Sequence, residues 1–169
     1  MNKKAAIWLG VLFLMVGSLV VMGLNSRNPG ISGGLLASAI SATDRVSGSP
    51  DAKVELIEYA DFQCPACGLY YPWVKDLKKE FDGKIKFAFR HFPLRSIHQN
   101  ADPASQAAEA AGLQGKFWEM HDQIFEHQND WSKNAGAKNL FEGYASQMGL
   151  DLQKFRTDRE SAATLDKIN

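Results

Sequence analysis

The stretch VELIEYADFQCPAC, residues 54–67, decides the fold, because an apolar strand runs directly into two closely spaced cysteines. Residues 54–59 are apolar and partly β-branched, a composition typical of a strand that is buried on both faces. A helix is expected from Cys64 to about Glu80, since apolar side chains recur there at helical spacing. These side chains are Leu69, Trp73, Leu77 and Phe81. The stretch therefore predicts a strand, a turn and a helix that begins at the first cysteine.

The rest of the chain predicts one more strand and then only helices. Apolar and polar residues alternate over residues 85–90, which indicates a second strand, and Pro93 ends it. Further helices are expected over 102–111, 116–127 and 137–148, and from a cap at Asp151 toward the end of the chain. The fold class is therefore α/β, with a β-α-β opening and a helical segment after it.

The sequence Cys64-Pro65-Ala66-Cys67 is a candidate redox site. Cys64 lies where a helix begins, and the free amides and the dipole of a helix N-terminus favour a thiolate. Pro65 suits the first helical turn, where a missing N–H costs nothing. Cys67 returns to the same side of the helix, so it can attack a mixed disulfide formed on Cys64. We interpret Cys64 as the nucleophile of thiol–disulfide exchange and Cys67 as the resolving thiol.

Two other roles for the cysteine pair stay open. Half of a zinc site would need two further ligands at suitable spacing, and His121 and His127 only come near the required separation. A purely structural disulfide would close a loop so short that it would stabilise the fold little. The redox role is favoured over both. No cofactor and no metal are expected.

Length and composition limit the class of protein. The chain has 169 residues, which suits one domain with appendages. Its 19 basic and 19 acidic residues give no net charge, so nothing indicates a nucleic-acid-binding protein. Two cysteines three positions apart are too few and too close for a disulfide-stapled secreted scaffold.

An uncharged apolar run covers residues 5–24 and, as a helix, would reach roughly 30 Å, about one hydrocarbon core. Lys3 and Lys4 precede it, so the positive-inside rule places residues 1–4 in the cytoplasm and the rest of the chain outside. We expect a single-pass signal-anchor helix in the cell membrane. The alternative is a cleaved signal peptide with a cleavage site at Ala37-Ser38-Ala39.

A linker is expected between this run and the domain. Residues 25–50 are rich in Gly, Ser, Ala and Asn and contain breakers such as Pro29-Gly30 and Gly33-Gly34, which predicts a flexible segment. The domain is then expected over residues 51–169.

Four motifs follow one another along the domain: EYADFQCPAC (58–67), FRHFPL (89–94), AAEA (107–110) and GKFWEMH (115–121). In this combination they resemble the DsbA-like thioredoxin family, especially its membrane-anchored bacterial members. The resemblance extends from about Gly48 to the end of the chain and implies a thioredoxin-like fold with an all-α insertion at about 101–169. Pro72 matches the helix-kinking proline of such domains, and the pair Cys64–Cys67 matches their redox-active disulfide.

The same resemblance suggests a role for Glu58, which matches the position of a buried acid beneath the active site. A carboxylate there would have its charged form disfavoured by burial and would exchange a proton with Cys67. The alternative is a strand residue whose carboxylate lies in water. Asp61 and Gln63 are interpreted as solvated turn residues. His91 and His98 are interpreted as surface residues of a loop, and the alternative is that they tune the local redox potential.

The resemblance and the expected compartment together predict the function. We expect an extracytoplasmic oxidase that introduces disulfides into exported proteins with free thiols, with a membrane redox partner that reoxidises its dithiol. A disulfide reductase or isomerase is the first alternative. The second is a chaperone-like binding module in which the dithiol is secondary, or an inactive fragment.

The C-terminal part predicts an incomplete fold. Every proline lies at or before Pro103, and nothing after Asp151 is typical of a strand. The cis-proline loop, the last two strands and the last helix of thioredoxin-like domains then have no counterpart here. One side of the strand over residues 54–59 would be unpaired, which is an aggregation hazard. The alternative is that the last helix covers this edge.

Overall fold

The computed structural model describes residues 38–169. The predicted cytoplasmic residues 1–4, the predicted anchor over residues 5–24 and most of the predicted linker lie outside the described residues. Within residues 38–169, no helix combines the length and the apolar character that crossing a membrane requires.

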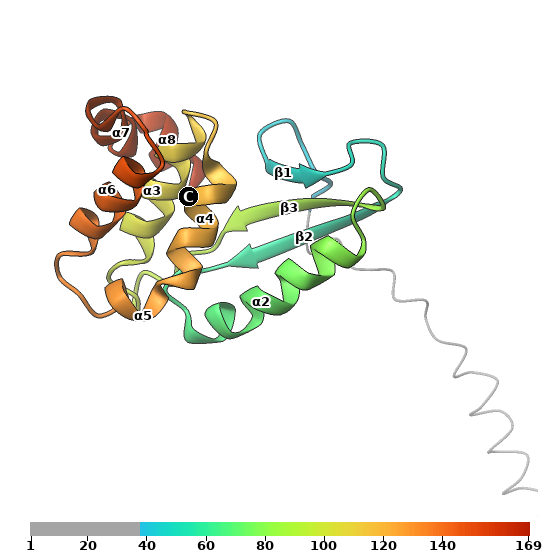
Figure 1. The fold of residues 1–169 in the computed structure, drawn as a ribbon, viewed down its shortest axis with the longest axis horizontal. Coiled ribbons are helices and arrows are strands. Elements are labelled where there is room, and N and C mark those ends of the chain that lie inside the picture. The colour runs from blue at the N-terminus through green and yellow to red at the C-terminus, as the bar shows by residue number, and fades with distance from the viewer. Residues whose placement is uncertain (1–37) are drawn as a thin grey trace, which may run out of the picture. The chain divides into compact units, whose positions relative to one another are not determined.

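The predicted β-α-β opening is present. β2 (Val54–Ala60) leads into α2 (Pro65–Glu80), and the chain returns through β3 (Ile85–His91), which pairs with β2 in parallel. Figure 1 shows α2 running alongside β2, and the later helices gathered beyond the ends to which the β2 and β3 arrows point. Because Cys64 follows the C-terminal end of β2, the two cysteines lie where the sheet meets the helices.

Only helices follow β3 in the described part of the chain. They are α3 (Ala101–Gly112), α4 (Phe117–Glu126), α5 (Gln128–Trp131), α6 (Ala137–Gln147), α7 (Leu152–Arg159) and α8 (Ala162–Lys167). The four predicted helices correspond to α3, α4, α6 and α7, and the predicted cap is confirmed, since the Asp151 carboxylate accepts the Lys154 N–H at 3.0 Å. α5 and α8 were not predicted as separate elements.

α3 lies at the centre of the helical segment because its buried positions carry small side chains. These are Ala101, Ala104, Ser105, Ala107, Ala108, Ala110 and Ala111, and α4, α6 and α7 all pack against this helix. Small residues let neighbouring helices approach closely, and the aromatic side chains of those helices then fill the space. Met120, Ile124, Phe125, Phe141 and Tyr144 are all buried.

A strand lies where the sequence predicted the end of the linker. β1 (Arg45–Gly48) pairs with β3 in antiparallel, with Arg45 opposite Phe89, and the compact unit begins at Ile40. The predicted boundaries, a linker to residue 50 and a domain from residue 51, are therefore wrong at this end. The sequence RVSG has little strand character of its own, so its conformation depends on pairing with a distant part of the chain.

Two ion pairs hold β1 and the turn before it against the domain. Arg90 donates to the Asp44 carboxylate (Nε to Oδ1, 2.7 Å) and lowers the pKa of Asp44 to about 2. Arg45 and His91 both bond to Glu109 of α3, each at 3.0 Å from a carboxylate oxygen. Burial alone would raise the pKa of Glu109, but the hydrogen bonds from His91 and Arg45 outweigh it and bring this pKa to about 2.

β2 is less buried than the sequence predicted. The strand order is β1-β3-β2, so β2 lies at the edge and pairs only with β3 among residues 38–169. Val54 is 59% exposed and Tyr59 is 45% exposed, which contradicts the prediction of burial on both faces. The apolar composition that indicated a central strand is therefore compatible with an edge position here.

Candidate functional site

The helix N-terminus presents Cys64 as predicted. Cys64 is the N-cap residue of α2, with extended backbone angles (φ −66°, ψ 121°), and Pro65 occupies the first turn. The Cys64 N–H donates to the Asp61 carbonyl (3.1 Å), and the Cys64 carbonyl accepts the Gly68 N–H (3.0 Å). Cys64 therefore lies at the end of the helix where the first amides have no helical partner, although its side chain caps none of them, and Pro65 and Ala66 are exposed. Both cysteines are half-buried free thiols.

Cys67 lies one turn into α2 and packs against the hydrophobic core. Burial is the main reason that the pKa of the Cys67 thiol is raised to about 11. The neighbouring Cys64 and the charge of Asp61 raise this pKa as well, whereas a hydrogen bond from the Asp61 backbone lowers it. Cys67 therefore keeps its proton at neutral pH. The roles of Cys64 as nucleophile and of Cys67 as resolving thiol stay predictions.

Glu58 is half-buried on β2, opposite Phe89 in the strand register. Burial raises the pKa of Glu58, and the charge of Lys78 lowers it. The Lys78 ammonium itself lies over the ring of Trp118, 4.0 Å from its centroid. The predicted burial of this carboxylate is thus present, whereas its exchange of a proton with Cys67 stays a prediction.

Asp61 is not the solvated turn residue that the sequence indicated, since it is only 2% exposed. Its carboxylate accepts the N–H groups of Gln63 (2.7 Å) and Leu94 (2.8 Å) and bonds to Nδ1 of His98 (2.7 Å). The His98 side chain is 13% exposed, so its interpretation as a surface residue is also wrong. The sequence signal for Asp61 was its place directly after the buried end of a strand.

Gln63 and Asn100 connect the loop before Cys64 to the helical segment. The Gln63 amide donates to the Ser132 carbonyl (2.6 Å), and its oxygen accepts the Asn100 N–H (2.6 Å). The Asn100 side chain donates in turn to the carbonyls of Trp131 (3.1 Å) and Asn134 (3.0 Å). Gln63 is therefore a partly buried bridge rather than a solvated turn residue.

Gln128, at the start of α5, bonds directly to the loop over residues 61–64, the redox loop. Its Nε2 donates to the carbonyl of Phe62 at 2.6 Å and to that of Cys64 at 2.9 Å. Nothing in the sequence pointed to this residue, because it lies 64 positions from Cys64.

The remaining histidines have structural partners. The predicted surface residue His91 has a side chain that is only 3% exposed and bonds to Glu109. His121 and His127, the nearest approach to a zinc-ligand pair, bond through Nδ1 to Asp122 (2.9 Å) and Asp130 (3.0 Å). Over residues 38–169, no group of three or more His, Cys, Asp or Glu side chains is placed to hold a metal ion.

Two cavities flank the redox motif and share Pro65 in their walls. One, of about 490 Å³, is also lined by Gln63, Arg95, Ile97, His98, Ser132 and Lys133. The other, of about 590 Å³, is also lined by Leu69, Tyr71, Pro72, Phe125 and Gln128. A polypeptide bound beside Cys64 would find open space on both sides of the helix start.

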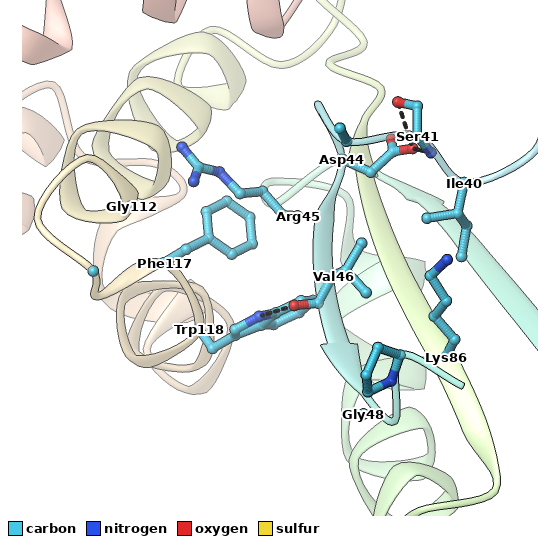
Figure 2. A pocket seen from close by; sticks show the side chains of 13 residues that line it. Ile40, Ser41, Asp44, Arg45, Val46, Gly48, Lys86, Gly112, Phe117 and Trp118 are labelled. Carbon is cyan, nitrogen blue, oxygen red and sulfur yellow. Dashed lines mark hydrogen bonds between the residues drawn. The ribbon is translucent and has the colours of Figure 1, made fainter. Parts of the chain in front are cut away.

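A further cavity of about 560 Å³ lies along β1, and Figure 2 shows Arg45, Phe117 and Trp118 around it. The dashed line between Trp118 and Val46 is a hydrogen bond of 3.2 Å from the indole Nε1 to the carbonyl. None of the lining residues belongs to the loop and helix turn over residues 58–68, so this cavity is separate from the dithiol.

The fold can be matched to known proteins. A family model described as "Thioredoxin" matches residues 41–168. The chain belongs to the thioredoxin family. Its β1 strand falls inside the matched range, which agrees with a domain that begins before residue 51.

Solved structures with the same fold include DsbA-like proteins. A thioredoxin-like oxidoreductase from Silicibacter pomeroyi DSS-3 is 25% identical, with a TM-score of 0.63 over 76% of this thioredoxin-family chain and 69% of the other. The thiol-disulfide exchange protein alpha-DsbA2 from Wolbachia pipientis is 22% identical, with a TM-score of 0.65 over 76% and 67% of the two chains. The predicted thioredoxin-like fold and the resemblance to the DsbA-like family are thus confirmed.

The chain also matches a segment of a protein that is named as an antiporter. The Na(+)/H(+) antiporter NhaA 1 of Salinispora arenicola is 42% identical over 125 residues, which are 72% of this thioredoxin-family chain and 18% of the antiporter. The chain spans less than a fifth of the relative that it matches. The likeness therefore concerns one segment of that protein.

Proposed function

We propose that this chain is a thiol–disulfide oxidoreductase that introduces disulfides into exported proteins. The observation that carries the proposal is the asymmetry of the dithiol, with Cys64 at the start of α2 and the pKa of Cys67 raised to about 11. An attacking substrate would therefore meet Cys64, and Cys67 would keep its proton once it is released.

A substrate thiolate attacks Sγ of Cys64 in the oxidised protein, the Cys64–Cys67 bond breaks, and Cys67 takes up a proton. A second substrate thiolate then attacks the substrate sulfur of the mixed disulfide and releases Cys64 as a thiolate. The substrate loses two electrons and gains a disulfide, and the protein ends as the dithiol. Glu58 is proposed to exchange the proton with Cys67.

We place the reaction outside the cytoplasm. Support comes from the apolar run over residues 5–24 with Lys3 and Lys4 before it, which fits a single-pass anchor with a cytoplasmic N-terminus. An oxidising compartment favours disulfide formation over reduction. The dithiol would then need a membrane partner that accepts its two electrons.

The test uses the full chain, purified in detergent and oxidised. Reoxidation of reduced ribonuclease is expected, while insulin reduction by the dithiol form is expected to be slow. A Cys64→Ser variant should lose the oxidase activity. Offered a disulfide-bonded protein such as oxidised ribonuclease, a Cys67→Ser variant should retain it as a mixed disulfide, because the Cys64 thiolate attacks the substrate disulfide, releases one substrate thiolate, and no Cys67 thiol resolves the adduct. Fast insulin reduction without ribonuclease reoxidation would instead identify a reductase.

A second candidate is a chaperone-like binding role, favoured by the apolar surface of α2. Leu69, Tyr70 and Trp73 are 66%, 56% and 62% exposed close to the dithiol. Exposed apolar side chains of this size are typical of surfaces that bind other polypeptides. Suppression of aggregation that persists in a Cys64→Ser/Cys67→Ser variant would support this role.

A further inference from the structure

Gln128 belongs to the helical segment, yet it bonds to the backbone of the redox loop. Its amide nitrogen donates one hydrogen to the Phe62 carbonyl (2.6 Å) and one to the Cys64 carbonyl (2.9 Å). Two carbonyl oxygens that converge on one point repel each other unless a donor lies between them. The amide therefore holds the loop closed just before α2 begins.

Gly68 makes room for this amide. A methyl group built on Gly68 would lie 2.5 Å from Oε1 and 2.9 Å from Nε2 of Gln128. Gly68 is an ordinary residue of α2, without the positive φ found at other glycines of the chain. Its lack of a side chain is explained by the close approach of Gln128 and not by the backbone conformation.

The Cys64 carbonyl also accepts the first helical hydrogen bond of α2, from the Gly68 N–H (3.0 Å). Gln128 thus acts on the peptide group that fixes where α2 begins and where the Cys64 thiol lies relative to the free amides. Its NH₂ group also brings the positive end of an amide dipole to this loop, which favours a thiolate on Cys64.

We propose that Gln128 is a positioning residue through which the helical segment sets the reactivity of Cys64. The proposal rests on the thiol–disulfide exchange proposed above. Loss of the Gln128 amide should disfavour the Cys64 thiolate, so that the disulfide becomes a weaker oxidant.

The first experiment compares Gln128→Met, which keeps the length of the side chain without a donor, with Gln128→Glu, which adds a negative charge. The control is Gln147→Glu, the same charge change at an exposed position of α6. In the full chain, we expect the equilibrium constant for reduction by glutathione to fall about tenfold in Gln128→Met, or about 30 mV. It should fall further in Gln128→Glu and not change in the control. Alkylation of Cys64 by iodoacetamide should slow in the same order.

The second experiment tests the contact from the other side. Gly68→Ala should lower the urea midpoint and the equilibrium constant for reduction by glutathione, because the methyl group displaces the Gln128 amide. In a Gln128→Ala background, the same substitution should raise the urea midpoint, because the space is then free and alanine is the better helix former. Gly68→Ala keeps Gln128 intact, so it tests the proposal even where a Gln128 variant does not fold.

The proposal is overturned if Gln128→Met and Gln128→Glu change the urea midpoint but leave two quantities within twofold of the parent. These are the equilibrium constant for reduction by glutathione and the rate of Cys64 alkylation. It is also overturned if Gly68→Ala raises the midpoint in the parent chain. A parent chain that does not exchange with glutathione would contradict the proposed function instead, and the alkylation rates would still report on Gln128.

Discussion

The two sides of α2 near the dithiol are built in opposite ways. Toward the helical segment, the side chains of Asp61, Gln63 and Gln128 each bond to backbone groups. On the outward side, Tyr70 and Trp73 are 56% and 62% exposed, and their rings meet edge to face at 5.2 Å. One side therefore fixes the position of Cys64, and the other offers apolar surface beside it.

The two sides therefore contribute to different properties, one to the stability of the fold and the other to surface that a partner can reach. Buried polar groups that are fully satisfied specify one geometry, and their loss is costly. Exposed aromatic side chains contribute little to the folded state but are available to a partner. Substitutions on the side of the helical segment should therefore change the stability, and substitutions on the outward side should change the binding of other polypeptides.

The largest effect is expected for Trp131→Ala, on the helical side. Trp131 is fully buried, donates from Nε1 to the Ile124 carbonyl (2.8 Å) and packs against Phe141. Truncation should cost about 3–5 kcal/mol of unfolding free energy. Urea denaturation under reducing conditions measures this loss. A loss below about 1 kcal/mol would contradict the view that the side toward the helical segment carries the stability.

The next largest effect is expected at Glu109, which joins α3 to β1. Its pKa falls from 4.5 to about 2 on folding, which corresponds to about 3 kcal/mol. Because the folded pKa is the lower one, this stability is present above pH 4.5 and is lost as the pH falls toward 2. Glu109→Gln should remove both the stability and its pH dependence, as followed by urea midpoints from pH 3 to 7. The exposed Glu119→Gln is the control.

A smaller effect on stability is expected for Glu58→Gln, which should stabilise the fold at pH 7 and slow thiol–disulfide exchange. Burial raises the pKa of Glu58, so the folded state holds its proton more tightly, and stability falls as the pH rises above 4.5. The variant should therefore be more stable than the parent at pH 7. Exchange with a model disulfide should slow by about tenfold or more. Equal exchange rates in parent and variant between pH 5 and 8 would remove Glu58 from the reaction.

The smallest effect on stability is expected for Trp73→Ala, on the outward side. A side chain that is 62% exposed should contribute no more than about 0.5 kcal/mol. Suppression of aggregation of an unfolded client should weaken in the same variant. A stability loss comparable to that of Trp131→Ala would mean that the outward side of α2 is covered.

Local sequence patterns were enough for most helices and for the redox motif. The spacing of apolar residues predicted α2, α4 and α6, and the Asp151 cap marked the start of α7. The position of Cys64 at a helix start followed from Pro65 and from the strand before it. These features depend on residues within one or two helical turns, which a single sequence displays directly.

Contacts between distant residues were beyond such patterns. β1 forms only against β3, and its residues Ser47 and Gly48 are typical of a linker. Asp61 and Gln128 are polar, and their burial depends on partners 37 and 64 positions away. Asp61 was interpreted as a solvated turn residue, because the local sequence does not show that distant donors satisfy a buried carboxylate.

The pairing of Arg45 with Glu109 also has a consequence for synthesis on the ribosome. The two residues are 64 positions apart, so at about 5–20 residues per second Glu109 is made about 3–13 s after Arg45. During that interval the nascent chain carries β2, α2 and β3 without the helix that fastens β1. Both edges of the incomplete sheet are then open to other chains, so a chaperone that covers extended segments, on the side of the membrane where the domain folds, should bind this protein before α3 is in place.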